Sequence, residues 1–342
     1  MTPTLVDEVS NETFPHSLGQ KRVPAKVRYR VGCPRARQQP GTGSNGSASS
    51  MRFDLNYFTG LVAALLLTAS VANAGKLAQT PQVGDTYEIT LTRHSVQHGS
   101  NGSSGSSNDK DTIIEQVTGV RADGLELQYD LPKSATADER ARTWQFPVRV
   151  FKPSSGPAQL LNSPELEARL DGWLKAASLP RTSCGHWIFT WSAFRIECDP
   201  QSVIKTVQSY DLGSAVLRDG EPYQDSEAKG PAKLTRTSGG SDSETFAVEI
   251  PVDADVVRRA RAESDVVVGE IMQKPVSLEA ALHQRAGEDV SGTISVTIET
   301  GPAGNARRRT RVTKLDTKGS DGHSETQTVT ETLERRRISR SE

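Results

Sequence analysis

The chain has 342 residues, of which 35% are hydrophobic and 24% charged, as in an ordinary soluble protein. Residues 1–74 hold 8 Lys and Arg against 4 Asp and Glu, so the part from Gly75 onward holds 33 against 38 and is mildly acidic. This balance argues against binding to nucleic acid or to an anionic membrane through bulk charge.

An apolar segment with a small-residue end precedes the acidic part. The run from Tyr57 to Leu67 is followed by Ala72-Asn73-Ala74, and signal peptidase requires small side chains of this kind before the cut. A stable membrane anchor needs about 20 apolar residues, so the run is too short for one. We predict a signal peptide at residues 51–74, cleavage between Ala74 and Gly75, and a periplasmic or secreted protein with no transmembrane anchor after cleavage. The alternatives are an uncleaved anchor or a buried core helix.

Residues 1–50 lie upstream of this segment and show no apolar periodicity. Basic residues are scattered there among Pro, Ser and Gly, a composition that buries too little apolar surface to fold. We therefore expect translation to begin at Met51 and residues 1–50 to be a gene-model extension. The alternative is a disordered basic arm on a signal-anchor protein.

Alternation of apolar and polar residues dominates after Thr86 and predicts strands with one buried face. Arg121 to Gly124 is predicted to form a tight turn. The Gly/Ser run from Gly99 to Asn108 is predicted to form a flexible loop. The connections are short, which favours an antiparallel meander. The strands are expected near residues 87–91, 113–120, 125–131 and 144–150.

Helical spacing of apolar residues predicts a helix at 164–178, with Ser163 as N-cap, and a second at 200–211. The segment from His186 to Cys198 between them is expected to be strand and the most buried part of the chain. Further on, helices are expected near 254–262 and 277–285, with Ser277 as cap, and strands near 246–252, 294–298, 307–315 and 324–333.

These elements predict an α+β protein with a mainly antiparallel, curved β-sheet packed with two to four amphipathic helices. The chain forms either one domain or two β-meander halves, residues 75–225 and residues 226–342.

Cysteine usage predicts one disulfide. Cys33 lies within residues 1–50, the expected gene-model extension. This leaves Cys184 and Cys198 as an even pair in an exported protein. Closing this loop would stabilise the fold by about 3 kcal/mol through loop entropy. The alternative is a reactive thiol, suggested by the neighbouring His186.

Aromatic residues cluster close to these cysteines. Trp187, Phe189 and Trp191 alternate, and Arg195 follows as a candidate partner for an anion. Such a cluster can line a ligand groove, and it can equally be core. The candidate pocket residues are therefore Trp187, Trp191 and Arg195.

Other charged residues are expected to be structural. His94 and His98 would lie about 13 Å apart on an extended chain, too far to share a metal ion. The run from Arg307 to Lys314 is expected to form an exposed edge strand. The tail from Arg335 to Arg337 is expected to be frayed. Asp253 and Asp255 suit a helix N-terminus. No metal or cofactor is predicted.

The chain holds no nucleophile elbow, phosphate loop, dinucleotide fingerprint or zinc-protease motif. We expect a non-enzymatic envelope protein that binds an apolar or amphipathic ligand or another envelope protein. The alternative is an envelope hydrolase with dispersed catalytic residues.

Overall fold

The computed structural model describes residues 81–189, 193–213, 217–240, 243–302 and 304–339. The predicted signal peptide, its cleavage site and Trp191 lie outside the described residues.

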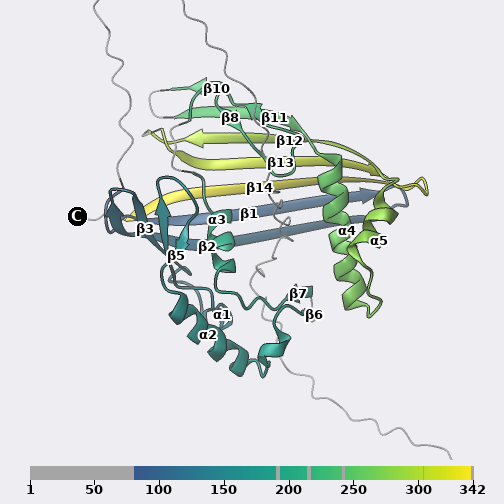
Figure 1. Ribbon diagram of the computed structural model, residues 1–342. Helices are drawn as coiled ribbons and strands as arrows, with labels where there is room; N and C mark the ends of the chain where they lie inside the picture. Colours follow the sequence, from purple (N-terminus) through teal and green to yellow (C-terminus); the bar gives the residue numbers. More distant parts are fainter. Residues whose placement is uncertain (1–80, 190–192, 214–216, 241–242, 303, 340–342) are drawn as a thin grey trace, which may run out of the picture.

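A single large antiparallel sheet of ten strands dominates the described chain (Figure 1). Its order is β10-β11-β12-β13-β14-β1-β2-β3-β4-β5, and it is open, with β10 and β5 at its edges. The strands are β1 (Thr86–Gly99), β2 (Ser104–Arg121), β3 (Gly124–Asp130), β4 (Val148–Pro153), β5 (Gln159–Leu160), β10 (Thr235–Gly239), β11 (Glu244–Pro251), β12 (Asp289–Thr300), β13 (Ala306–Lys318) and β14 (Ser324–Ser339).

The remaining elements are short strands and helices. They are α1 (Ala137–Arg142), α2 (Ser163–Ala176), a 3-10 turn (Arg181–Ser183), α3 (Ser202–Ser209), α4 (Ala254–Ile271), α5 (Leu278–Arg285) and two small two-stranded sheets, β6 (Trp187–Phe189) with β7 (Ala193–Arg195) and β8 (Pro222–Tyr223) with β9 (Ala232–Lys233). The prediction of a mainly antiparallel sheet with a few helices is confirmed.

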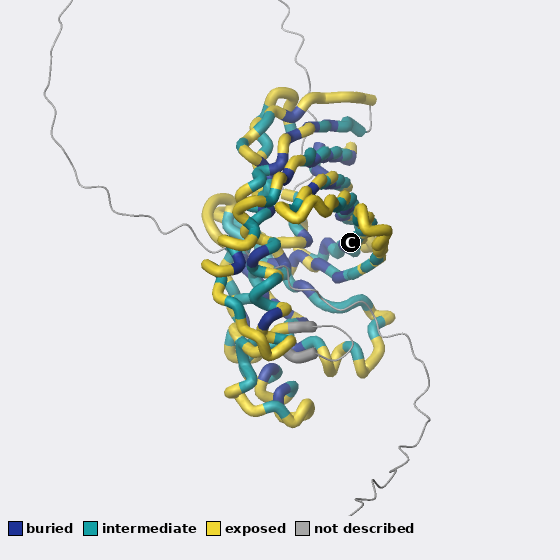
Figure 2. The backbone as a smooth tube through the Cα atoms, turned by 90° about the vertical axis from the view of Figure 1, so that its right-hand side faces the viewer, coloured by how far each residue is buried: buried dark blue, intermediate teal, exposed yellow. Residues whose placement is uncertain are grey.

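The first and last long strands are neighbours in the middle of the sheet. β1 pairs with β14 from Thr86 to Gly99. Strands from both predicted halves, residues 75–225 and residues 226–342, therefore belong to the same sheet. Buried and more exposed residues alternate along the strands (Figure 2), because successive side chains point to opposite faces.

Two apolar clusters lie on the face that the helices cover. One joins β1–β4 to α2 and α3 and includes Ile89, Val117, Leu166, Leu170 and Val203, all at most 1% exposed. The other joins β11, β12 and α4 and includes Phe246, Ile294 and Val257. Burial of such side chains stabilises the sheet against its helices by roughly 1.5–3 kcal/mol each.

Only part of the Gly/Ser run forms the expected loop: residues 100–103 connect the two strands, whereas Ser104 to Asn108 belong to β2. β1 extends to Gly99 and β2 begins at Ser104, and the two pair as far as His98 with Ser104. β14 pairs with the other side of β1 up to Gly99. Pairing with β1 holds Ser104 to Asn108 extended, and its backbone hydrogen bonds offset the entropy that these flexible residues lose.

The basic strand and the basic tail also differ from expectation. β13, with Arg307 to Lys314, is an interior strand paired with both β12 and β14, not an edge. Arg335 to Arg337 lie within β14, paired with β1, and are not frayed. The reason is that carboxylates far away in sequence neutralise several of these guanidinium groups, as Asp225 does for Arg311, Glu115 for Arg335 and Asp85 for Arg337.

The end of one helix differs from its predicted position. The helix expected near 254–262 continues to Ile271, and the next turn folds so closely that a Cβ on Gly269 would lie 2.7 Å from the Lys274 carbonyl oxygen. Asp253 caps this helix through its side chain, which accepts from the N–H groups of Asp255 and Val256, and Ser277 caps α5; both interpretations are confirmed.

Three other elements need correction. α2 begins at Ser163, so Asn162 rather than Ser163 is its N-cap residue. The strand expected from residue 144 starts at Val148, because Pro147 has no N–H to donate to a ladder. The helix α1, which the Thr136–Glu139 capping box begins, was not predicted.

The segment after His186 is not the most buried part of the described chain. His186 is exposed and Trp187 is half-buried. The reason is that β6 has only three residues and pairs with β7 in a separate small sheet, not with the large one.

Candidate functional site

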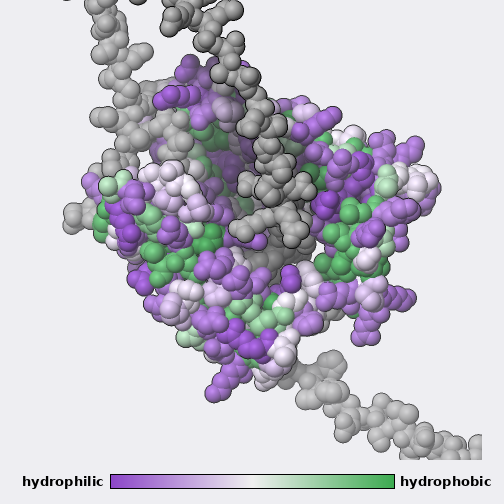
Figure 3. Space-filling view, in the orientation of Figure 1, coloured by the Kyte–Doolittle hydropathy of each residue, from purple (hydrophilic) through white to green (hydrophobic). Residues whose placement is uncertain are grey.

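A cavity of about 890 Å³ lies between the large sheet and the elements that cover it. Its floor comes from β1, β2, β13 and β14, and its walls from α3, α4, α5 and the β6–β7 hairpin. Apolar side chains gather over α4 and α5 at the right of the molecule (Figure 3). The apolar and aromatic lining includes Leu91, Trp187, Tyr210, Val266, Leu278 and Leu333.

One cross-strand row forms the apolar part of the floor. Strand register places Arg309 opposite Leu333, Leu333 opposite Leu91, and Leu91 opposite Asp111. The row therefore carries a positive side chain at one end, two leucines in the middle and a carboxylate at the other end. All four residues line the cavity.

The next row along the same strands is charged throughout its length. Arg311, Glu331, Arg93 and Asp109 face one another in register. Glu331 pairs with Arg311 at 3.4 Å and with Arg93 at 3.9 Å. Opposite charges directly across a ladder attract, so Glu331 neutralises its neighbours on both sides, whereas Asp109 forms no ion pair within the described residues.

Arg311 is the best-satisfied cation of the floor. Its side chain is 9% exposed, and it donates to both oxygens of Asp225, at 2.8 and 3.0 Å, to Glu227 at 2.6 Å and to the Thr313 hydroxyl at 2.7 Å. Burial lowers the pKa of Arg311, but the two carboxylates outweigh it and hold the pKa above its ordinary value. These contacts fix Asp225 and Glu227 onto the sheet and thereby hold the 223–226 segment, which lines the cavity.

Asp111 and Arg309 have a different environment. Both are half-buried, and within the described residues neither forms an ion pair or a side-chain hydrogen bond. Burial, and to a lesser extent the charge of Asp109, raises the pKa of Asp111 to about 6. Burial raises the pKa of Tyr210, and the Asp111 carboxylate adds to this, so the two side chains are close enough to interact.

The disulfide Cys184–Cys198 positions one wall. Around it, the Gly185 N–H donates to the Ile196 carbonyl at 2.8 Å, and Arg195 Nε donates to the Gly185 carbonyl at 2.7 Å. Ile196 is 1% exposed, which anchors this hairpin in the core below α3. Trp187 is thereby held at the cavity.

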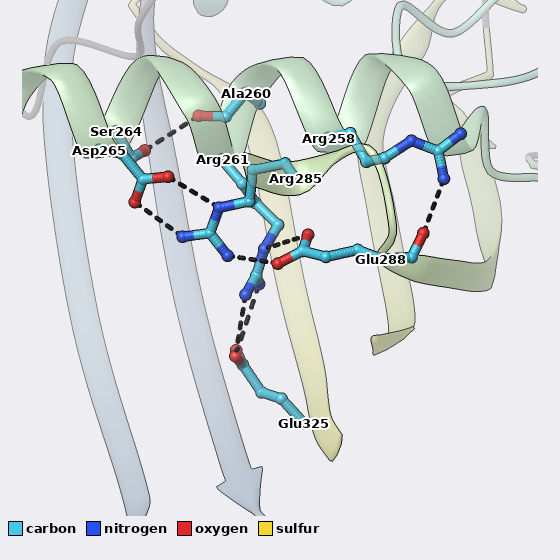
Figure 4. A network of polar contacts seen from close by, with 8 residues as sticks. All are labelled: Arg258, Ala260, Arg261, Ser264, Asp265, Arg285, Glu288 and Glu325. Atoms are coloured by element: carbon cyan, nitrogen blue, oxygen red, sulfur yellow. Dashed lines mark hydrogen bonds and ion pairs between the residues drawn. The ribbon is translucent and has the colours of Figure 1, made fainter. Parts of the chain in front are cut away.

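A second polar network holds the opposite wall (Figure 4). Arg285 of α5 makes a two-pronged contact with Asp265 of α4, at 2.7 Å on each side, and pairs with Glu288. Arg261 of α4 reaches both Glu288 and Glu325 of β14, each at 3.3 Å. The two helices are therefore fixed to each other and to the sheet, which places Val266 and Leu278 over the floor.

Two of the predicted pocket residues, Trp187 and Arg195, line this cavity, whereas Trp191 lies outside the described residues. The His186 side chain is exposed and forms no hydrogen bond within the described part of the chain. The residues of the cavity floor were not predicted from the sequence. Their only signal was two pairs of like charges two residues apart, Asp109 with Asp111 and Arg309 with Arg311, each of which could have marked one face of a strand.

Among the described residues, no group of three His, Cys, Asp or Glu side chains is placed to hold a metal ion. His94 and His98 lie on β1, where His94 contacts Asn108 at 2.6 Å. Within the same part of the chain, none of the helices has the length and apolar character needed to span a bilayer.

No protein-family model and no curated protein matches the chain. Among solved structures, Ail, the attachment invasion locus protein of Yersinia pestis, is similar at 4% identity and a TM-score of 0.16, over 74% of this chain and 99% of that chain. An outer membrane channel from Pseudomonas putida F1 is similar at 8% identity and a TM-score of 0.17, over 75% of this chain and 97% of that chain. Both TM-scores are too low for either similarity to carry an argument about this chain.

Proposed function

We propose that the protein is a non-enzymatic envelope protein, periplasmic or secreted, whose cavity binds an apolar or amphipathic ligand. The observation that carries this is the cavity of about 890 Å³ with leucines at the centre of its floor. Small-molecule sites are mostly clefts of about 300–1,000 Å³ with apolar walls and a few polar groups. The apolar segment at 51–74 and the Cys184–Cys198 disulfide support export, because disulfides persist in oxidising compartments.

The binding part is tested with an apolar fluorescent probe, N-phenyl-1-naphthylamine, added to the chain from Gly75 onward. We expect saturable enhancement of the probe's fluorescence. Leu91→Asn, on the floor, should weaken binding by about tenfold, because the probe loses apolar contact worth about 1.4 kcal/mol. Thr92→Asn is the matched control, since Thr92 is exposed on the other face of the same strand. Equal binding by both variants would contradict a site on this floor.

The export part is tested on protein purified from its native cells. We expect an N-terminus at Gly75 and no thiol labelling of Cys184 or Cys198 before reduction. An intact chain in the cytosol with both thiols free would refute export. Native mass spectrometry of the same sample would show which molecule co-purifies.

A second candidate, an envelope hydrolase, is favoured by one observation. Asp109 and Asp111 lie two residues apart on the same strand and line the cavity, and the pKa of Asp111 is raised to about 6, within the range of a general acid. A panel of chromogenic ester and glycoside substrates tests this. Turnover that Asp111→Asn abolishes would favour the hydrolase over the binding protein.

A further inference from the structure

The row Arg309–Leu333–Leu91–Asp111 carries two charges that the described protein does not neutralise. In the neighbouring row, two residues further along the same strands, Glu331 pairs with both Arg311 and Arg93. Arg309 and Asp111 have no such partner within the described residues, although both are half-buried. A half-buried charge without a counter-charge costs free energy that a bound ligand of opposite charge can offset.

The distance between these charges sets the shape of a ligand. The row crosses four adjacent strands, so its end Cα atoms lie roughly 14 Å apart at the usual strand spacing. Leu333 and Leu91 fill the middle of this span and form an apolar strip between the charges. Leu333 is 1% exposed, so the half-buried Leu91 presents most of the accessible apolar surface of this strip.

The residues around the row do not neutralise the positive charge at Arg309 or the negative charge at Asp111. Near Arg309, the Tyr223 phenol is close enough for the guanidinium to oppose the effect of burial, which raises the phenol's pKa. Near Asp111, the charged neighbour is Asp109, which has the same sign, and the Tyr210 phenol is close enough for the Asp111 carboxylate to raise its pKa. Lys205 and Glu263 line the walls from α3 and α4 rather than the floor.

We propose that the ligand of this cavity is a zwitterionic amphiphile. Its acidic group binds Arg309, its amino group binds Asp111, and its apolar segment lies across Leu333 and Leu91. This inference rests on the proposed ligand-binding function and specifies the chemistry that the site selects.

The test compares four amphiphiles with the same twelve-carbon chain by isothermal titration calorimetry at about pH 7.5: 12-aminododecanoic acid, dodecanoic acid, dodecylamine and dodecanol. We expect the amino acid to bind at least about tenfold more tightly than any of the other three. Arg309→Met should remove its advantage over dodecylamine, and Asp111→Asn its advantage over dodecanoic acid. Arg309→Lys, which keeps the charge, should retain most of the preference.

Arg308→Met and Lys110→Met are the matched controls, because each alters a neighbouring residue that points to the opposite face of the same strand. Circular dichroism checks that every variant is folded. Equal affinity for all four compounds would overturn the zwitterion inference and leave the apolar binding function standing. Binding of none of them would refute both, and a preference that neither Arg309→Met nor Asp111→Asn alters would overturn the assignment of these two residues.

Discussion

Arg311→Met tests whether the ion network under the cavity floor holds the fold together. Arg311 is 9% exposed and its main partner, Asp225, is 8% exposed, so the pair is almost completely desolvated. The substitution keeps much of the apolar stem and removes the guanidinium that contacts both oxygens of Asp225. Removing one partner of a buried ion pair typically costs about 3–5 kcal/mol, because the remaining charge stays in a site with little water.

Urea denaturation at neutral pH, followed by tryptophan fluorescence and circular dichroism, measures this loss as a change in the free energy of unfolding. Arg308→Met is the matched control in the same strand. Its side chain is 46% exposed and its contact with Glu299 is 3.7 Å long, so it should change stability by less than about 1 kcal/mol.

Asp225→Asn in the Arg311→Met background completes the experiment. It removes the carboxylate that the first substitution leaves behind, so the double variant should be more stable than Arg311→Met alone. A loss for Arg311→Met no larger than that for Arg308→Met would refute the view that this network stabilises the floor.

Three further predictions concern the walls and the floor. Replacing Cys184 and Cys198 together by Ser should lower the free energy of unfolding by about 3 kcal/mol, since the bridge joins residues 14 apart; an unchanged urea midpoint would contradict this. Asp111→Asn should stabilise the ligand-free protein on the order of 1 kcal/mol at about pH 7.5 and leave it unchanged at about pH 3.5. The sign follows because burial raises the Asp111 pKa from 3.8 to about 6, so the folded state binds more protons than the unfolded state in that window and wild-type stability falls as pH rises through it. Parallel pH profiles for the two proteins would exclude this. Arg285→Gln should accelerate hydrogen exchange in α5 by removing its contact with Asp265, whereas α2 should exchange as before; uniform acceleration would indicate global destabilisation instead.

Local patterns were sufficient for much of the secondary structure. Alternation at Tyr87, Ile89 and Leu91 predicted a strand because one face of the sheet is buried and the other is not. The turn at Arg121 to Gly124 joins β2 to β3 as expected, and Ser277 caps α5. These features depend on residues that are close in sequence, so the sequence alone could determine them. The pairing of Cys184 with Cys198 followed from there being only two candidates.

The candidate site depended on contacts between distant parts of the chain. Arg311 meets Asp225 across 86 positions, Arg335 meets Glu115 across 220, and Arg337 meets Asp85 across 252. A run of basic residues therefore looked exposed, because the carboxylates that neutralise it were far away in sequence.

The pairing of β14 with β1 decided these contacts and the cavity floor together. That pairing aligns Leu333 with Leu91, and it extends β1 as far as Gly99, the first residue of the Gly/Ser run. Residue periodicity determines which side chains share a face of a strand, but it contains no information about which strands become neighbours. The strands were therefore determined locally, whereas the row of side chains across them exists only in the folded sheet.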